Sequence, residues 1–312
     1  MKIYFQYDPD NKTGKGKFLN RLKPELEKLG CKIQYDLNGA DITLGVTRWR
    51  GDTTKKRVLR IDGIHLLNDK HHVWNNQRIK KAIRKSDAVI YQSKWAKYMI
   101  NNIFKIDPVC YTIYNGADPE DYKETIKSPY PKNVVLSSKW KAGDDRRMKR
   151  LREMYEIAKI CVEKRSDVCF WIAGFTDMKD EKIERIKWLG LLEDSDLRKY
   201  LSMGDVYLHL TWWSWCDNSL VEAICAGCVP IGNDICGNYE MIKEAGGIGV
   251  AIDKPLKPRA DYSSNKPPKF DHAPVLTALD DALDNKRIVN CEHVHIKNIA
   301  KQYYEVFKSV LN

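Results

Sequence analysis

Residues 212–237, WWSWCDNSLVEAICAGCVPIGNDICG, constrain the fold more than any other stretch, because they combine a capped helix with a buried strand. The polar run 217–219 stands directly before the apolar run LVEAICA, as N-cap residues do, and Gly227 follows where a C-terminal cap belongs. The apolar segment CVPIG then predicts a short buried strand. A helix joined closely to such a strand is typical of an α/β domain.

The polar start of this helix also predicts an anion site. The first N–H groups of a helix have no partner within it, and together with the helix dipole they attract phosphate. Glu222 lies near that end, where its carboxylate can accept hydrogen bonds from the two hydroxyls of a ribose. The dipole alone also favours a glutamate in the first turn. The stretch therefore leaves two readings open, a nucleotide site and a purely structural glutamate.

Apolar segments of strand length alternate with amphipathic patterns along the rest of the chain, which predicts parallel sheets. Predicted strands cover residues 2–8, 31–36, 41–46, 57–62, 133–140 and 167–175, and predicted helices cover 18–30, 151–165 and 295–312. The segment 123–133 contains two prolines and predicts a linker. We therefore expect an N-terminal domain at 1–127, a C-terminal domain at 128–295 and a final helix at 296–312.

The charge of the chain indicates an anionic partner. Its 312 residues contain 53 Lys and Arg against 42 Asp and Glu, which gives a net charge of +11. A nucleoside diphosphate, an anionic membrane surface and a nucleic acid all fit this charge. No apolar run approaches transmembrane length, and the N-terminus lacks the apolar core of a secretory signal. Nine cysteines without compact spacing fit reduced thiols, so we expect a cytoplasmic protein, with peripheral membrane contact as a further option.

The segment 218–242 resembles the donor-binding signature of retaining glycosyltransferases with the GT-B fold, of the glycosyl transferases group 1 or family 4-like type. The residues in register with that signature are Asn218, Glu222, Ala223, Gly227, Pro230, Gly237 and Glu240. Residues 86–93, ending in the helix-capping Ser93, and residues 111–122 are similar to two further segments of the family. The resemblance implies an α/β fold with two Rossmann-like, doubly wound domains that face a cleft. It also implies a final helix that crosses back onto the N-terminal domain.

The resemblance further implies where the donor binds. In this family the helix glutamate, here Glu222, holds the ribose, and the loop before it holds the sugar and the diphosphate. The loop candidates are Ser214, Trp215, Cys216, Asp217, Asn218, Ser219 and Leu220. Ser214 stands where the family usually has an acidic residue that contacts the donor sugar, which leaves the identity of the sugar open.

Other donor contacts come from separate parts of the chain. Lys139, Lys149 and Arg150 resemble paired basic residues that clamp the diphosphate, with an ordinary solvated helix face as the alternative. The backbone near Lys187 and Trp188 corresponds to the place where relatives hold the base. The remaining candidates are Gly174 at a strand end, and Gly14 and Gly16 in a loop similar to the family's glycine-rich loop.

Three residues are the predicted catalytic groups: Lys139, Lys149 and Asp62. Asp62 ends a predicted strand, where ligand groups of open α/β sheets gather, and it can contact the acceptor hydroxyl or the donor sugar. A turn aspartate before glycine is the alternative.

We expect no metal site. Cys225 lies in a predicted helix and Cys228 starts a predicted strand, so their C-x-x-C spacing is not expected to converge on zinc. A solvent-facing loop explains His65, His71 and His72.

These features together predict a metal-independent hexosyltransferase without a cofactor. The resemblance implies a UDP- or GDP-sugar as co-substrate, a hydroxyl of a glycan, lipid or glycoprotein as acceptor, and retention of the anomeric configuration. Two alternatives remain. The acceptor could be a nucleic acid, which we regard as the less favoured partner, or the protein could bind sugar nucleotides or carbohydrates without catalysis.

Overall fold

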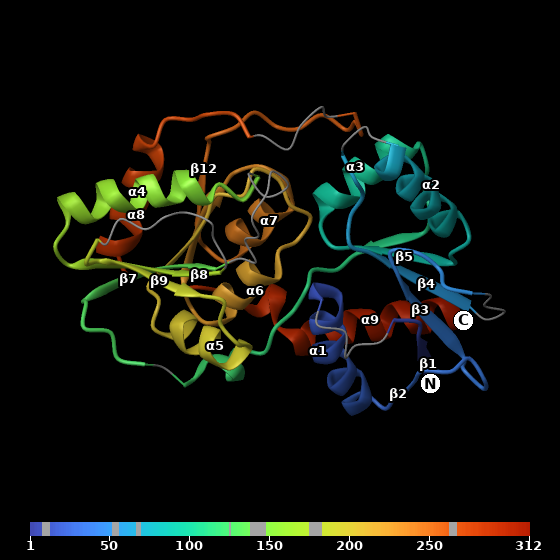
Figure 1. The fold of residues 1–312 in the computed structure, drawn as a ribbon. Coiled ribbons are helices and arrows are strands. Elements are labelled where there is room, and N and C mark those ends of the chain that lie inside the picture. The colour runs from blue at the N-terminus through green and yellow to red at the C-terminus, as the bar shows by residue number, and fades with distance from the viewer. Residues whose placement is uncertain are drawn as a thin grey trace. The chain divides into compact units, whose positions relative to one another are not determined.

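The computed structural model describes residues 1–7, 13–51, 56–66, 70–124, 126–137, 148–174, 183–261 and 267–312. The chain divides into two compact units (Figure 1). The first unit consists of Met1–Ala117, Lys257–Ser264 and Val294–Asn312, and the second of Asp118–Leu256 and Asn265–His293.

The first unit is built on a parallel six-stranded sheet in the order β2-β1-β3-β4-β5-β6. The strands are β1 (Lys2–Phe5), β2 (Lys32–Gln34), β3 (Ile42–Val46), β4 (Lys56–Ile61), β5 (Ala88–Tyr91) and β6 (Cys110–Thr112). Every residue of β3 and β5 is buried, as expected for parallel strands that are covered on both faces.

Helices cover both faces of this sheet. They are α1 (Gly14–Lys28), α2 (Lys70–Arg84), α3 (Lys94–Phe104) and the C-terminal α9 (Ile296–Leu311). Figure 1 shows α1 and α9 on one face and α2 and α3 on the other. The rings of Phe18 on α1 and Tyr303 on α9 lie 5.8 Å apart, so the end of the chain packs against the first helix of this unit. Ser93 caps α3 as predicted, since its hydroxyl accepts a 3.0 Å hydrogen bond from the Ala96 N–H.

The second unit repeats this plan with the strand order β12-β11-β10-β7-β8-β9, again all parallel. Its strands are β7 (Lys132–Ser137), β8 (Val168–Ala173), β9 (Ile186–Gly190), β10 (Val206–His209), β11 (Val229–Asn233) and β12 (Ile248–Val250). Its helices are α4 (Leu151–Lys164), α5 (Asp194–Ser202), α6 (Asn218–Cys225), α7 (Cys236–Glu244) and α8 (Ala273–Asp284).

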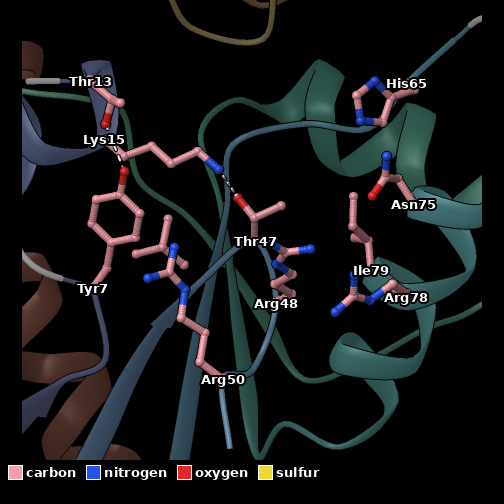
Figure 2. A pocket seen from close by; sticks show the side chains of 11 residues that line it. Tyr7, Thr13, Lys15, Thr47, Arg48, Arg50, His65, Asn75, Arg78 and Ile79 are labelled. Atoms are coloured by element: carbon pink, nitrogen blue, oxygen red, sulfur yellow. Dashed lines mark hydrogen bonds between the residues drawn. The ribbon is translucent and has the colours of Figure 1, made fainter. Parts of the chain in front are cut away.

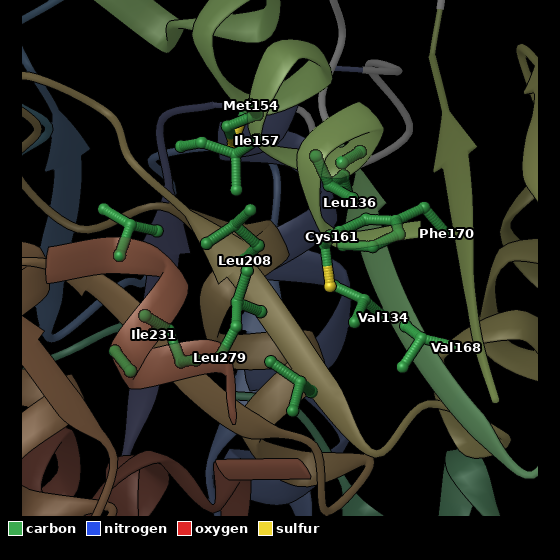
Figure 3. Packing of buried hydrophobic residues seen from close by; sticks show 14 of the residues in the cluster. Val134, Leu136, Met154, Ile157, Cys161, Val168, Phe170, Leu208, Ile231 and Leu279 are labelled. Atoms are coloured by element: carbon green, nitrogen blue, oxygen red, sulfur yellow. The ribbon is translucent and has the colours of Figure 1, made fainter. Parts of the chain in front are cut away.

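The core of the second unit lies between its sheet and two helices (Figure 3). Val134, Phe170 and Leu208 point from three neighbouring strands toward α4 and α8. Met154, Ile157 and Leu279 of those helices fill the other side. This packing fixes the carboxyl ends of the strands, where ligand sites form in open α/β sheets.

The predicted fold class, with two Rossmann-like α/β domains, is confirmed. The predicted helix in 218–226 is α6, and Gly227 follows it with a φ of 88°. One local prediction was wrong, because His71 and His72 lie in the first turn of α2 instead of a loop. That turn contains no acidic residue, so a common sequence sign of a helix start is missing. None of the helices in the described ranges is both long and apolar enough to cross a membrane.

Candidate functional site

A compact polar cluster lies at the carboxyl ends of the central strands of the second unit. His209 is the last residue of β10, Asp217 caps α6, and Lys149 lies just before α4. Lys149 Nζ donates to Asp217 Oδ2 over 2.7 Å, and His209 Nε2 lies 2.9 Å from the same oxygen. His209 Nε2 also lies 2.8 Å from Asn238 Nδ2, so the imidazole contacts both Asp217 and Asn238.

Further contacts hold the cluster in place. Asn238 Nδ2 donates to Asp217 Oδ2 over 3.1 Å, and Asn238 Oδ1 accepts from the Asp217 backbone N–H over 3.0 Å. The Trp212 N–H donates to the Met148 carbonyl over 2.8 Å, which fixes the segment that carries Lys149. The Lys149 ammonium is therefore held beside the first turn of α6, where backbone N–H groups also favour an anion.

Burial and pairing set the protonation of this cluster. Burial lowers the pKa of His209, although its hydrogen bond to Asp217 acts in the opposite direction. Burial alone would raise the pKa of Asp217, but the charge of Lys149 and the hydrogen bond from His209 hold that pKa well below its usual value. At neutral pH the cluster thus contains a neutral imidazole beside a carboxylate.

The predicted donor loop lies around this cluster. Asn218 and Ser219 begin α6, and Ser219 hydrogen-bonds the buried phenol of Tyr207. The Leu220 N–H donates to the Asp217 carbonyl over 3.2 Å, and the Leu220 side chain is buried in the core.

The residues just before α6 are held by α7. The Ser214 N–H lies 3.4 Å from Cys236 Sγ, and the Ser214 carbonyl accepts from the Gly237 N–H over 3.1 Å. Cys216 is buried, with its Sγ 3.5 Å from Met241 Sδ. The structure thus brings the predicted residues 214–220 together with Lys149.

Trp215 and Glu222, two further predicted donor residues, pack against other side chains of the second unit. The ring of Trp215 packs edge-on against Trp213, with 6.0 Å between the ring centroids. Glu222 is buried, with only 4% of its surface exposed, and lies near the buried Tyr207. The predicted contact of Glu222 with a ribose stays a prediction.

Arg150 has a structural role that the sequence does not reveal. Its guanidinium donates to Asp253 over 2.6 and 2.8 Å and to the Pro268 carbonyl over 3.0 Å, and it lies over the Phe270 ring. The side chains of Arg150 and Asp253 are 0% and 1% exposed. Arg150 is thus paired with a carboxylate inside the second unit, and its predicted diphosphate contact stays a prediction.

The other predicted donor residues of the second unit lie directly after β8 and on β9. The Gly174 N–H donates to the Gly190 carbonyl over 2.7 Å, directly after β8. Lys187 and Trp188 are on β9, and the Trp188 ring packs against Tyr155 with 5.4 Å between centroids. No hydrogen bond within the described residues joins Gly174, Lys187 or Trp188 to the polar cluster. Lys139 lies outside the described residues.

His209, Thr211 and Asn238 belong to the cluster but were missed by the sequence reasoning. Thr211 Oγ1 lies 3.1 Å from His209 Nε2. The sequence did contain one indication of His209, because it is the polar residue that ends the apolar segment VYLH. Ligand groups gather at the carboxyl ends of parallel strands. Asn238 sits inside a helix and gives no comparable sign.

The predicted residues of the first unit form a second charged cluster. Asp62 follows β4, and its carboxylate accepts from Arg60 Nη1, from Gln92 Nε2 over 2.7 Å and from Thr47 Oγ1 over 3.2 Å. Lys15 Nζ lies 3.2 Å from Asp62 and 2.6 Å from Thr47 Oγ1. Asp62 is therefore the anion that holds two cations in place.

Gly14 and Gly16 lie in the first turn of α1. Thr13 caps this helix through a 3.3 Å hydrogen bond from the Gly16 N–H, so the two glycines lie beside Lys15.

A pocket of about 300 Å³ opens beside Asp62 in the first unit. Figure 2 shows Tyr7, Thr13 and Lys15 on one side, Thr47, Arg48 and Arg50 next to them, and His65 and Arg78 opposite. We call this pocket, lined by Lys15, Arg48, Arg50, His65 and Arg78, the basic pocket. It lies where the parallel strands β1, β3 and β4 end.

No group of three potential metal ligands occurs among the described His, Cys, Asp and Glu residues. Cys225 ends α6, whereas the Cys228 thiol is buried and donates to the Leu201 carbonyl over 3.1 Å.

Comparison with known proteins matches part of the chain to a family. Residues 142–257 match the family model described as "Glycosyl transferases group 1". This segment contains Lys149, His209, Asp217 and Asn238, the whole polar cluster of the second unit. No curated protein sequence matches the chain.

Solved structures with a similar fold span the whole chain. Sucrose-phosphate synthase from Thermosynechococcus elongatus has a TM-score of 0.68 at 12% identity, covering 99% of this chain and 98% of its own. AviGT4, a glycosyltransferase involved in avilamycin A biosynthesis, has a TM-score of 0.64 at 10% identity, covering 100% and 98%. HepE from Anabaena, solved with UDP and glucose, has a TM-score of 0.61 at 13% identity, covering 99% and 100%. At these identities the similarity shows the fold alone.

Proposed function

We propose that this chain is a glycosyltransferase that transfers a hexose from a nucleoside diphosphate to an acceptor hydroxyl. The match of residues 142–257 to the group 1 family model and the fold shared with the solved glycosyltransferase AviGT4 support this proposal. The donor is a UDP- or GDP-sugar, and the UDP and glucose bound by the Anabaena relative support this class. The acceptor is a hydroxyl of a glycan, a lipid or a glycoprotein.

One observation carries the proposal: Asp217 holds the Lys149 ammonium beside the first turn of α6. An ammonium has three N–H donors, and Asp217 takes one of them, so donors remain for a diphosphate. The N–H groups at the start of α6 supply further donors for the same anion. A fixed cation and fixed dipoles cost no reorganisation when charge develops on the departing phosphate.

The chemistry follows from this arrangement. As the bond between the anomeric carbon and the phosphate oxygen breaks, negative charge grows on the diphosphate and Lys149 stabilises it. The acceptor hydroxyl attacks from the same face and its proton passes to the departing phosphate, so the configuration is retained. Because Lys149 and α6 carry the stabilisation, we propose that the reaction needs no metal and no cofactor.

We place the reaction in the cytoplasm, with peripheral membrane contact when the acceptor is a lipid. The nine cysteines are all free thiols, which fits a reducing compartment.

The first experiment identifies the donor. A thermal-shift screen across UDP-, GDP- and ADP-sugars should single out one base, and calorimetry then gives its affinity. Lys149→Ala should weaken binding of that donor roughly 10- to 150-fold, the value of about 1.5–3 kcal/mol for one charge-assisted contact. Lys243→Ala, which removes an exposed lysine of α7 in the same unit, is the matched control and should bind like the wild type. Equal affinities of both variants would exclude Lys149 as a diphosphate ligand.

The second experiment tests the ribose contact and the reaction. Glu222→Ala should weaken donor binding strongly and leave the circular dichroism spectrum unchanged. Unchanged donor affinity would count against that role. Transfer to candidate acceptors, followed by NMR of the anomeric proton of the product, tests retention directly. Donor binding without transfer or hydrolysis would instead identify a non-catalytic sugar-nucleotide-binding protein, and a salt-dependent shift of duplex DNA would favour a nucleic-acid acceptor.

A further inference from the structure

The basic pocket of the first unit has a large excess of positive charge. Lys15, Arg48, Arg50 and Arg78 line it, and none of the lining residues that the structure describes is acidic. Within the described part of the chain, the only carboxylate paired with these cations is Asp62 on Lys15. Asp62 also neutralises the buried Arg60, so its single charge is shared between two cations. Among the residues that the structure describes, the positive charges of the pocket therefore exceed the negative charge that pairs with them.

The shape of the pocket is set by a strained turn. Thr47 follows β3 with a φ of 65°, a left-handed conformation that is rare for a β-branched residue. Its N–H donates to the Arg60 carbonyl over 2.7 Å, and its hydroxyl joins Lys15 to Asp62. This turn places Thr47, Arg48 and Arg50 along one wall of the pocket (Figure 2). Strain of this kind persists where the surroundings fix it, and it is concentrated at binding sites.

The opposite wall comes from α2 and the segment after β4. Arg78 lies on α2, where its guanidinium is stacked over the Trp74 ring, and Asn75 lies one turn before it. His65 completes this wall. Guanidinium groups from two separate elements thus approach one cavity, and their forked N–H groups match the oxygens of a phosphate.

We propose that the basic pocket binds a phosphate monoester carried by the acceptor. A dianion of this kind balances more of the excess charge than a carboxylate does, and the Tyr7 and Thr13 hydroxyls and the Asn75 amide supply neutral hydrogen bonds. The volume of about 300 Å³ accommodates the phosphate and part of the group that carries it. This inference rests on the proposed transferase function, since it assigns the acceptor of that reaction.

The electrostatics of Lys15 agree with this proposal. The pKa of Lys15 is lowered to about 8, chiefly by burial and also by the charges of Arg60, Arg48 and Arg50, against the opposing effect of Tyr7. A phosphate bound in the pocket would offset these like charges and favour the protonated lysine.

Calorimetry with inorganic phosphate tests the pocket without any donor. The wild type should bind phosphate, and Arg48→Ala and Arg78→Ala should each weaken that binding roughly tenfold or more. Arg84→Ala, which removes an exposed arginine of the same helix α2, is the matched control and should bind like the wild type. Phosphate binding that is absent, or equal in all four proteins, would overturn the proposal. Acetate that competes as well as phosphate would overturn it in favour of a carboxylate.

Donor affinity separates this inference from the proposed function. The UDP- or GDP-sugar that binds the wild type should bind Arg48→Ala and Arg78→Ala equally well, because the pocket lies in the first unit and Lys149 in the second. Loss of phosphate binding with intact donor binding therefore supports the pocket alone. If the wild type binds the donor but no phosphate, the phosphate site is excluded and the proposed transferase function is unaffected.

The phosphate can belong to a soluble acceptor or to a lipid, and sedimentation with vesicles distinguishes the two. Phosphatidylcholine vesicles that contain phosphatidic acid should bind the wild type and not Arg78→Ala if the acceptor is a lipid. Inorganic phosphate should then compete. Phosphate binding without vesicle binding indicates a soluble phosphate monoester, and both results support the pocket. The proposal would be overturned if the protein bound no inorganic phosphate, bound phosphatidylserine vesicles as well as phosphatidic acid vesicles, and kept this vesicle binding in Arg78→Ala.

Discussion

Asp253→Ala tests whether the Arg150–Asp253 pair holds the second unit together. The carboxylate accepts two hydrogen bonds from Arg150, at 2.6 and 2.8 Å, and a third from Asn233 Nδ2 at 2.6 Å. Its removal leaves the Arg150 guanidinium inside the protein with, among the described residues, the Pro268 carbonyl and the Phe270 ring as its remaining contacts. Breaking a buried pair in this way costs about 3–5 kcal/mol.

Two further variants separate the buried charge from simple loss of packing. In the Asp253→Ala background, Arg150→Met removes the charge that was left unpaired, so it should recover a large part of the lost stability. Glu156→Ala on α4 breaks a 2.8 Å pair with Lys159, but its side chain is half exposed, so the cost should stay below about 1 kcal/mol.

The assay is urea unfolding followed by tryptophan fluorescence, with the free energy of unfolding taken from the midpoint and slope. Asp253→Ala should shift the midpoint far more than Glu156→Ala does. If the two variants cost the same, the buried pair is not the stabilising contact that its geometry indicates. If Arg150→Met adds a further loss, unpaired charge is not the cause of the instability.

Three further predictions follow from particular residues. Burial lowers the pKa of His209, so below the ordinary histidine pKa of 6.5 the unfolded chain takes up a proton that the folded state resists. The free energy of unfolding should therefore fall as the pH drops below 6.5. Urea unfolding at several pH values should show a smaller fall for His209→Gln than for the wild type. Lys105 ends α3 with a left-handed φ of 51°, which is strained for a residue with a side chain. Lys105→Gly should therefore raise the free energy of unfolding by up to about 1 kcal/mol, whereas Lys97→Gly inside α3 should lower it by about 1 kcal/mol. If thermal unfolding gives the reverse order, the backbone of Lys105 is not strained. Phosphate binding to the basic pocket should weaken as pH rises through about 8, where Lys15 loses its proton; calorimetry at successive pH values should show this decline in the wild type and not in Lys15→Met.

Local patterns were enough to predict β1, β2, β3, β4, β7 and β8 and the helices α1, α4, α6 and α9. The start of α6 and the position of Gly227 depend on cap chemistry within ten residues, so the sequence determines them directly. The parallel strands follow from apolar runs of strand length between helices. The resemblance to group 1 glycosyl transferases predicted that Lys149 lies near the loop before α6. The hydrogen bond between Lys149 and Asp217 confirms this proximity.

The missed features depend on contacts between distant residues. Arg150 precedes an amphipathic helix, which is typical of a surface cation, and only Asp253, 103 positions later, makes it part of the core. The basic pocket gathers residues from β3–β4, from α2 and from the start of α1, and no short segment shows that these cations face one another. His209 is a polar residue at the end of an apolar strand, and its pairing with Asp217 exists only because α6 begins beside β10.

Each unit has an aspartate paired with a lysine at the carboxyl ends of its strands, but the two sites differ in net charge. In the second unit Asp217 pairs with Lys149 over 2.7 Å, one carboxylate for one cation, so any affinity for a diphosphate needs the added N–H groups of α6. In the first unit Asp62 lies 3.2 Å from Lys15 but also pairs with Arg60, and Arg48, Arg50 and Arg78 remain around the same cavity. The excess of cations in the first unit is therefore too large to be explained by the internal pairing of Lys15 and Arg60 with Asp62. We therefore assign a separate phosphate to the basic pocket of the first unit, in addition to the diphosphate that Lys149 and the first turn of α6 bind in the second unit.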